Sequence, residues 1–325
     1  MLTGVDWLLI LWMGLMGGAL GSFMNVVVYR MPAGQSIVHP PSRCPACGHL
    51  IRWRHNVPVL GWLILGGRCH DCRAPISRRY PLVEALVAGV FMALACGEIV
   101  FGGVNLPHYV PREEAIASPA AWAIYAFHLL LLGSLICAAL IEYDANLLPM
   151  RLVTLVLAIG VFAPLALSDL RPVTAGLGTE SSGTRLLDFV AGVLAGVVMR
   201  TAGWPSVFEV MDRRAKAAQP RSERRAQRRR KLKAELNGDS RRQVLATIYF
   251  PLVAVGVFLG WQAAIAVGFL ATMLQFTAAL AGNLWPLLRR PPLSTWQCLV
   301  AIGYLLTWNH WASWVPLLGG WHVTR

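Results

Sequence analysis

The sequence predicts an all-α polytopic membrane protein of about eight transmembrane helices with a small cytoplasmic zinc-binding insert. Its 325 residues are 56% hydrophobic and only 14% charged, with a mean hydropathy of +0.54. Soluble domains average about 25% charged residues. A second observation is a pair of CxxC motifs inside one polar, Arg-rich loop. An ordinary soluble globule is therefore excluded, and the charges must be concentrated outside the bilayer.

The predicted spans are apolar segments close to the ~20 residues that a helix needs to cross the hydrocarbon core. We expect them at 7–28, 81–101, 120–142, 151–168, 186–204, 244–260, 262–285 and 297–319. The first segment lacks a basic start and a small-residue cleavage site, so we interpret it as a span and not as a signal peptide. The chain then divides into a first helix (1–29), an insert (30–80) and a main membrane domain (81–325) with a basic loop at 205–243.

The distribution of basic residues predicts the orientation. The chain has 29 Lys and Arg against 16 Asp and Glu, and most of its Lys and Arg fall in 30–79, in 205–243 or at helix ends on the same side. Short loops rich in Lys and Arg remain in the cytoplasm. We therefore expect both loops in the cytoplasm and both termini outside. The dense basic run at 221–233 is expected to contact anionic lipid headgroups, and no nucleic acid is expected as a partner.

Four of the seven cysteines form the predicted metal site. Cys44 and Cys47 make one CxxC motif, and Cys69 and Cys72 make the second. This spacing is typical of a zinc ribbon, because each CxxC turn presents two thiolates to one tetrahedral Zn²⁺. Four cysteine ligands leave no open position for a catalytic water, so we expect a structural zinc. The other three, Cys96, Cys137 and Cys298, lie in apolar segments and are expected to be packing residues.

The residues around these motifs resemble the type IV prepilin peptidases over 15–90. The similarity lies in the run from Gly18 to Pro32, the Cys-Pro-Ala-Cys-Gly-His motif, Asn56-Val-Pro-Val-Leu-Gly-Trp62 and Ile76-Ser-Arg-Arg-Tyr-Pro-Leu-Val-Glu84. The resemblance implies an inner-membrane enzyme that cleaves the basic leader of type IV prepilins or type II secretion pseudopilins. It also implies that the new N terminus is methylated with S-adenosylmethionine.

The resemblance implies two catalytic aspartates near the cytoplasmic face. Asp144, in Glu142-Tyr-Asp-Ala-Asn-Leu-Leu-Pro149, matches the first. The second belongs in Gly-x-Gly-Asp-x-Lys, and the nearest match here is Gly238-Asp239-Ser240-Arg241, with Leu236 in place of the first glycine. We expect Asp239 to lie in a loop before the sixth span, and Asp212 is a weaker alternative. Glu84, Glu142 and Asp144 are the acids expected to contact a basic leader.

Three functions remain open from the sequence. The first is an active peptidase and methyltransferase in which residues 81–325 form the membrane peptidase domain. The second is a divergent homologue without proteolysis that binds pilins or assists their assembly. The third, an unrelated zinc-ribbon scaffold or transporter, is disfavoured because the predicted spans carry almost no charge in their interiors.

Overall fold

The computed structural model describes residues 2–101, 112–167, 170, 182–202, 238–284 and 291–307. In these ranges the regular structure is helical, and β structure is limited to two isolated bridges. The chain forms two compact units: residues 1–104 with 110–121, and residues 105–109 with 122–325. The predicted all-α class is confirmed.

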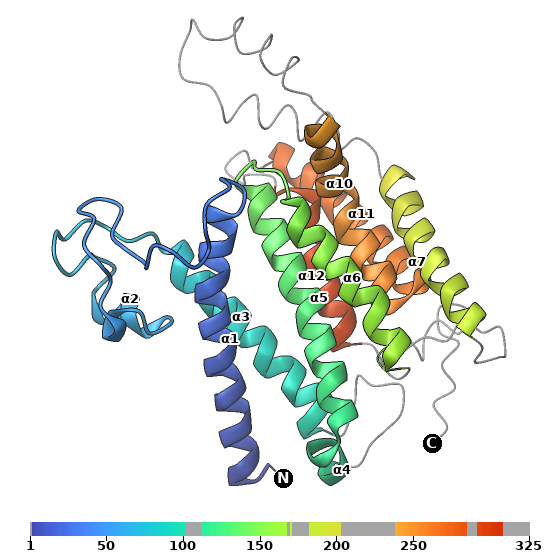
Figure 1. Ribbon diagram of the computed structural model, residues 1–325, viewed down its shortest axis with the longest axis horizontal. Helices are drawn as coiled ribbons and strands as arrows, with labels where there is room; N and C mark the ends of the chain where they lie inside the picture. The colour runs from blue at the N-terminus through green and yellow to red at the C-terminus, as the bar shows by residue number, and fades with distance from the viewer. Residues whose placement is uncertain are drawn as a thin grey trace, which may run out of the picture. The chain divides into compact units, whose positions relative to one another are not determined.

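The first unit is built around two long apolar helices. It contains α1 (Gly4–Arg30), the insert with η1 (Trp53–His55) and α2 (Leu60–Ile64), α3 (Arg79–Ala95), the π-helical turn η2 (Cys96–Val100) and α4 (Arg112–Ala117) (Figure 1). Glycines bring α1 and α3 together: a Cβ on Gly21 would lie 2.8 Å from the Cα of Glu84, and one on Gly17 would lie 2.9 Å from the Cα of Ala88. Small residues one turn apart allow such close approach between membrane helices.

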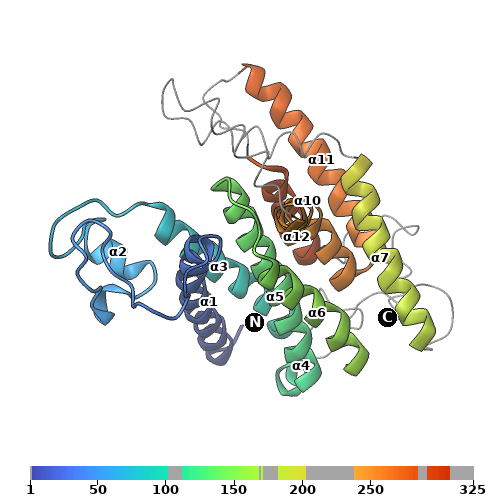
Figure 2. The same ribbon diagram turned by 45° about the horizontal axis from the view of Figure 1, so that its top comes forward.

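The second unit is a bundle with α10 at its centre. Its helices are α5 (Pro119–Tyr143), α6 (Met150–Ala166), α7 (Ser182–Ala202), α10 (Gly238–Leu259), α11 (Trp261–Leu284) and α12 (Leu293–Leu306). α10 packs against α6, α7, α11 and α12 (Figure 2). The ring of Phe258 on α10 also stacks on Phe127 of α5, with centroids 4.3 Å apart. The central helix is therefore covered on several sides by apolar neighbours.

Helices α7 and α10 make direct backbone contact. Gly192 and Gly196 lie one turn apart on α7 and face α10. A Cβ on Gly192 would collide with the carbonyl group of Gly256, and one on Gly196 would lie 2.7 Å from the carbonyl oxygen of Leu252. This is the small-xxx-small packing that joins transmembrane helices without a hydrophobic driving force between them.

Five helices in the described part of the chain are long and apolar enough to cross a membrane: Gly4–Arg30, Arg79–Val100, Pro119–Tyr143, Arg241–Leu259 and Trp261–Ala278. Two shorter apolar helices are Met150–Ala166 and Leu293–Leu306. All eight predicted segments coincide with helices, although the eighth, 297–319, continues outside the described residues. The multi-pass architecture is confirmed, whereas the count of eight spans and the three-part division at residues 29 and 80 stay predictions.

Candidate metal centre and candidate active site

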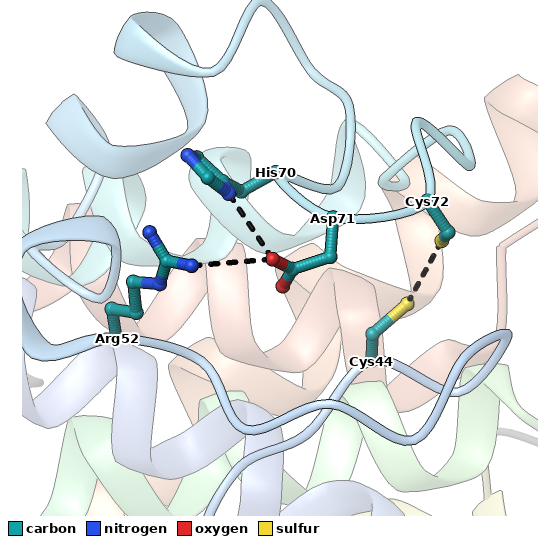
Figure 3. Close-up of polar contacts among 5 residues, drawn as sticks. All are labelled: Cys44, Arg52, His70, Asp71 and Cys72. Atoms are coloured by element: carbon teal, nitrogen blue, oxygen red, sulfur yellow. Dashed lines mark hydrogen bonds and ion pairs between the residues drawn. The ribbon is translucent and has the colours of Figure 1, made fainter.

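The four predicted cysteines form one cluster in the insert. Cys44, Cys47, Cys69 and Cys72 have sulfur atoms that all lie within 4.8 Å of one another. Figure 3 shows the Sγ atoms of Cys44 and Cys72, which are 3.8 Å apart. A Zn–S bond of about 2.3 Å places tetrahedral ligands about 3.8 Å apart, whereas a disulfide needs about 2.05 Å. The cluster therefore fits a tetrahedral metal ion such as Zn²⁺.

The first CxxC motif lies in a tight turn. The Cys44 N–H donates to the carbonyl of His49 (2.9 Å), and the Gly48 N–H donates to the carbonyl of Cys44 (2.8 Å). Gly48 has φ +73°, a left-handed conformation that glycine adopts without penalty. An isolated bridge between Arg43 and Leu50 closes the turn. These bonds direct both cysteine side chains to the same side of the backbone.

The second CxxC motif repeats this geometry at equivalent positions. The Cys69 N–H donates to the carbonyl of Ala74 (2.8 Å), and the Arg73 N–H donates to the carbonyl of Cys69 (3.1 Å). A bridge between Arg68 and Pro75 closes this turn. The left-handed residue is here Arg73, with φ +60°. The two turns thus share one backbone design, but the second places a non-glycine residue in a strained conformation.

The electrostatics of the first motif favour a bound cation. The backbone N–H of Cys47, and then that of Ala46, lower the pKa of Cys44 from 9.0 to about 6. The backbone N–H of His49 favours the Cys47 thiolate, but desolvation and the three neighbouring thiols outweigh it and raise the pKa of Cys47 to about 12. A cation bound between these thiols would stabilise their thiolate forms, because its charge offsets the repulsion between them.

A cluster of polar side chains connects the rest of the insert to the second CxxC motif. Asp71 Oδ1 accepts from Arg52 Nη2 at 3.4 Å and lies 3.2 Å from His70 Nδ1 (Figure 3). The hydrogen bond with His70, and then the charge of Arg52, hold the pKa of Asp71 below its usual value. The ring of His70 also stacks on that of His55 at 4.8 Å. These contacts orient the loop between the two motifs around the metal site.

The first predicted aspartate lies where α5 ends. The Asp144 N–H makes the last helical bond, to Leu140 (3.1 Å), and Ala145 then turns the chain with φ +57°. The Asp144 side chain is exposed, whereas Glu142, two residues earlier, is buried. The catalytic role of Asp144 stays a prediction.

A buried hydrogen bond fixes the loop that follows Asp144. The Leu148 N–H donates to Thr247 Oγ1 on α10 at 2.8 Å, and the Thr247 hydroxyl donates to the Gln243 carbonyl at 2.8 Å. The sequence analysis missed Thr247, because a threonine in an apolar helix carries no signal of a distant partner. This bond places the Asp144 loop beside the first half of α10.

Asp239 lies on the same helix. The sequence predicted a loop at 205–243 and a membrane span from Val244, whereas α10 begins at Gly238. Asp239 is therefore in the first turn of α10, about 12 Å along the axis from Thr247. Polar residues before a span can continue its helix into water, and sequence hydropathy marks only the apolar part. Asp212 lies outside the described residues.

Two further charged residues have structural contacts that the sequence did not indicate. Pro251 lies inside α10 and lacks a backbone donor. In the turn before it, the buried Arg200 of α7 donates from Nε to the Ile248 carbonyl at 2.9 Å. In the first unit the buried Glu84 accepts the Val59 N–H at 2.7 Å through Oε2, and its expected contact with a leader stays a prediction.

The other cysteines match their predicted packing role. Cys137 and Cys298 are buried and Cys96 is half-buried, and all three have free thiols. None of them belongs to the metal cluster found in the described part of the chain.

Comparison with known proteins agrees with the resemblance to the type IV prepilin peptidases. The family model of the Bacterial Peptidase A24 N-terminal domain matches residues 15–97, which include both CxxC motifs and α3 through Ala95. A prepilin leader peptidase/N-methyltransferase from Myxococcus xanthus is 36% identical over 194 residues, covering 60% of this chain and 48% of the relative. No solved structure matches the chain significantly.

Two other relatives have related names. A type 4 prepilin-like proteins leader peptide-processing enzyme from Escherichia coli is 33% identical over 200 residues, covering 56% of this chain and 62% of the relative. A prepilin leader peptidase/N-methyltransferase from Dickeya chrysanthemi is 32% identical over 192 residues, covering 38% of this chain and 67% of the relative. The chain thus spans about half to two thirds of the length of these relatives.

Proposed function

Since the chain belongs to the prepilin leader peptidase/N-methyltransferase family, we propose that it is a membrane aspartic endopeptidase that cleaves the leaders of type IV prepilins or pseudopilins. It also methylates the new N terminus. The observation that carries the proteolytic part is the exposed Asp144 at the end of α5, in a loop bonded to the helix that begins with Gly238 and Asp239.

In this mechanism Asp144 and Asp239 work as a pair. One carboxylate takes a proton from the attacking water, and the other, protonated, donates to the oxygen of the scissile carbonyl. Two neighbouring carboxyl groups share one proton because both cannot ionise cheaply, and the pair therefore holds one group in each state. Asp144 alone would lack this division of roles.

The metal in this proposal is a structural zinc. Cys44, Cys47, Cys69 and Cys72 would hold it, and four thiolates fill its coordination sphere. A filled sphere supplies no bound water, so the zinc would fix the two CxxC turns and take no part in hydrolysis. S-adenosylmethionine would supply the methyl group, and no residue of this chain is assigned to it.

We further propose that the protein lies in the bacterial inner membrane with its N terminus outside and with the insert and Asp144 in the cytoplasm. The supports are the five apolar helices and the basic residues of 30–79 and 205–243. In the second unit, the Leu148 bond to Thr247 puts the Asp144 end of α5 on the same side as the start of α10. The substrate leader and anionic headgroups would then meet the protein on one face.

One observation favours the alternative, a divergent homologue without proteolysis that binds pilins or assists assembly. Asp239 lies in the first turn of α10, about two helical turns before Thr247, the residue that bonds the Asp144 loop. Glu142 and Asp188, the other described acids of the second unit, are buried. Asp188 is also about 18 Å along α7 from Arg200, the residue that contacts α10 next to Thr247, at Ile248. If Asp239 stays too far from Asp144 to share a proton with it, the dyad is incomplete, as the alternative requires.

A cleavage assay separates the two functions. Purified protein is incubated with a prepilin and S-adenosylmethionine, alongside Asp144→Asn and Asp239→Asn. For an active dyad we expect each variant to lose at least ~10²-fold in cleavage while methylation of a pre-cleaved pilin persists. Normal cleavage by Asp239→Asn would remove that residue from the mechanism. A wild type that binds the prepilin but never cleaves it would establish the alternative.

A further inference from the structure

The insert contains a segment that runs beside the membrane helices. Pro58 lies against α1, where a Cβ on Gly18 would be 3.2 Å from the Pro58 Cβ. Gly18 precedes Arg30, the charged end of α1, by about 18 Å along the helix axis. Val59, the next residue, bonds to Glu84, which is about 7 Å inside the start of α3 at Arg79. Along the axes of α1 and α3, the segment therefore lies further into the apolar part of each helix than the charged residues Arg30 and Arg79.

The backbone of this segment is suited to an apolar medium. Val59 has φ +61° and ψ −53°, a γ-turn conformation that is strained for a β-branched residue. Four N–H groups of the turn have acceptors within the first unit: Val59 to Glu84 Oε2 (2.7 Å), Leu60 to Pro58 O (2.6 Å), Gly61 to Val57 O (2.7 Å) and Leu63 to Val59 O (3.1 Å). Irregular backbone within a bilayer needs such internal partners.

The side chains that follow the turn are apolar and exposed. The exposed fractions of Leu60, Leu63 and Ile64 are 52%, 57% and 72%. Helix α1 also has exposed apolar side chains, including Leu15, Leu20 and Phe23. Water would not favour such a surface on a five-residue helix, whereas acyl chains already cover the neighbouring span.

The residues bordering this surface are those of a membrane interface. Trp53 is 85% exposed, and Arg52 and Arg54 beside it are exposed as well. Tryptophan prefers the level of the headgroups, and arginine is attracted to anionic lipids. This combination fits a lipid surface whose headgroups are partly anionic.

We propose that residues 57–64 form a re-entrant segment inserted into the leaflet at the Arg30 end of α1. Leu60, Leu63 and Ile64 contact acyl chains, and Trp53 lies among the headgroups. Glu84 anchors the segment by accepting the Val59 N–H. The two CxxC motifs flank the segment on either side, so the metal that joins them closes the loop that carries it.

The test places a benzophenone amino acid at Ile64 of the full-length protein in nanodiscs of phosphatidylethanolamine and phosphatidylglycerol. The matched control is Gln35, an exposed residue whose N–H bonds to the Arg30 carbonyl at the end of α1 (3.0 Å). After irradiation, mass spectrometry should find lipid adducts at Ile64 in at least several-fold excess over Gln35. Equal yields at both sites, or a crosslinked dimer in place of lipid adducts, would overturn the proposal.

The role of Glu84 is tested in the same experiment. Glu84→Ala removes the acceptor and should lower the lipid adduct at Ile64 several-fold, whereas Glu84→Gln keeps an acceptor oxygen and should retain most of it. An undiminished adduct in Glu84→Ala would reject the anchoring role. Because the readout needs neither a prepilin nor cleavage, the result is independent of the proposed enzymatic function.

Discussion

The insert and the contact between α7 and α10 solve the same problem, the joining of two chain segments, by different means. In the insert, two short turns meet through four sulfur atoms, and most surrounding side chains are exposed. In the bundle, Gly192 and Gly256 touch directly, and α10 buries Leu252, Val255 and Phe258 almost completely. A segment without an apolar core depends on a metal, whereas a helix pair in lipid depends on close backbone packing. Each region should therefore be disrupted independently of the other.

Loss of the metal should have the largest effect. About one Zn²⁺ per chain should copurify, and Cys44→Ser or Cys69→Ser should abolish its binding and make residues 40–80 sensitive to protease. The insert has no core to replace the metal. Limited proteolysis and metal analysis measure both effects. Freshly purified, reduced protein without zinc would reject the metal site. If α7 and α10 became as sensitive to protease as the insert, the two regions would not be independent.

The converse change is Gly192→Ala in α7. Its new methyl group would collide with the Gly256 carbonyl, so we expect the bundle to lose about 3 kcal/mol of unfolding free energy while zinc content stays at the wild-type value. Gly303→Ala on α12 is the control, since a Cβ there meets nothing within 4 Å. Thermal unfolding in detergent should show a lower midpoint for the first variant only, and matched midpoints would mean that the helices do not touch.

A smaller effect is expected from Thr247→Val. The valine keeps the shape but leaves the buried Leu148 N–H without its acceptor, which costs about 1–3 kcal/mol. Because this bond holds the loop after Asp144, cleavage should fall with stability while the insert is unchanged. Thr277→Val is the matched control, as its hydroxyl bonds only to the Leu274 carbonyl on an exposed surface. If both variants behaved alike, the Leu148 contact would have no role in fixing the loop.

The smallest effect compares the two metal turns with each other. Gly48→Ala puts a side chain at φ +73° and should lower insert stability by about 1 kcal/mol, although a Cβ there meets no atom within 4 Å. Arg73→Gly relieves the same strain at φ +60° and should raise stability by less than about 1 kcal/mol, because glycine also gains entropy in the unfolded chain. Zinc competition with a chelator measures both shifts. Changes of the same sign would show that the turns are not equivalent.

Features carried by local sequence could be predicted. Apolar runs predicted the helices because burial in lipid depends on composition over about 20 residues. The spacing of Cys44, Cys47, Cys69 and Cys72 predicted the ligand set because a CxxC turn is itself a local structure. The polar first turn of α10, before the predicted span, was not predicted, since it carries no hydropathy signal.

Contacts between distant residues were decided by tertiary structure alone. Leu148 and Thr247 are 99 positions apart, and Val59 and Glu84 are 25 apart. A threonine, a valine N–H or a glutamate looks the same in sequence whether it faces water, lipid or a neighbouring helix. Its role depends on which backbone group lacks a partner once the helices have packed, because an unpaired polar group in an apolar medium is too costly to leave.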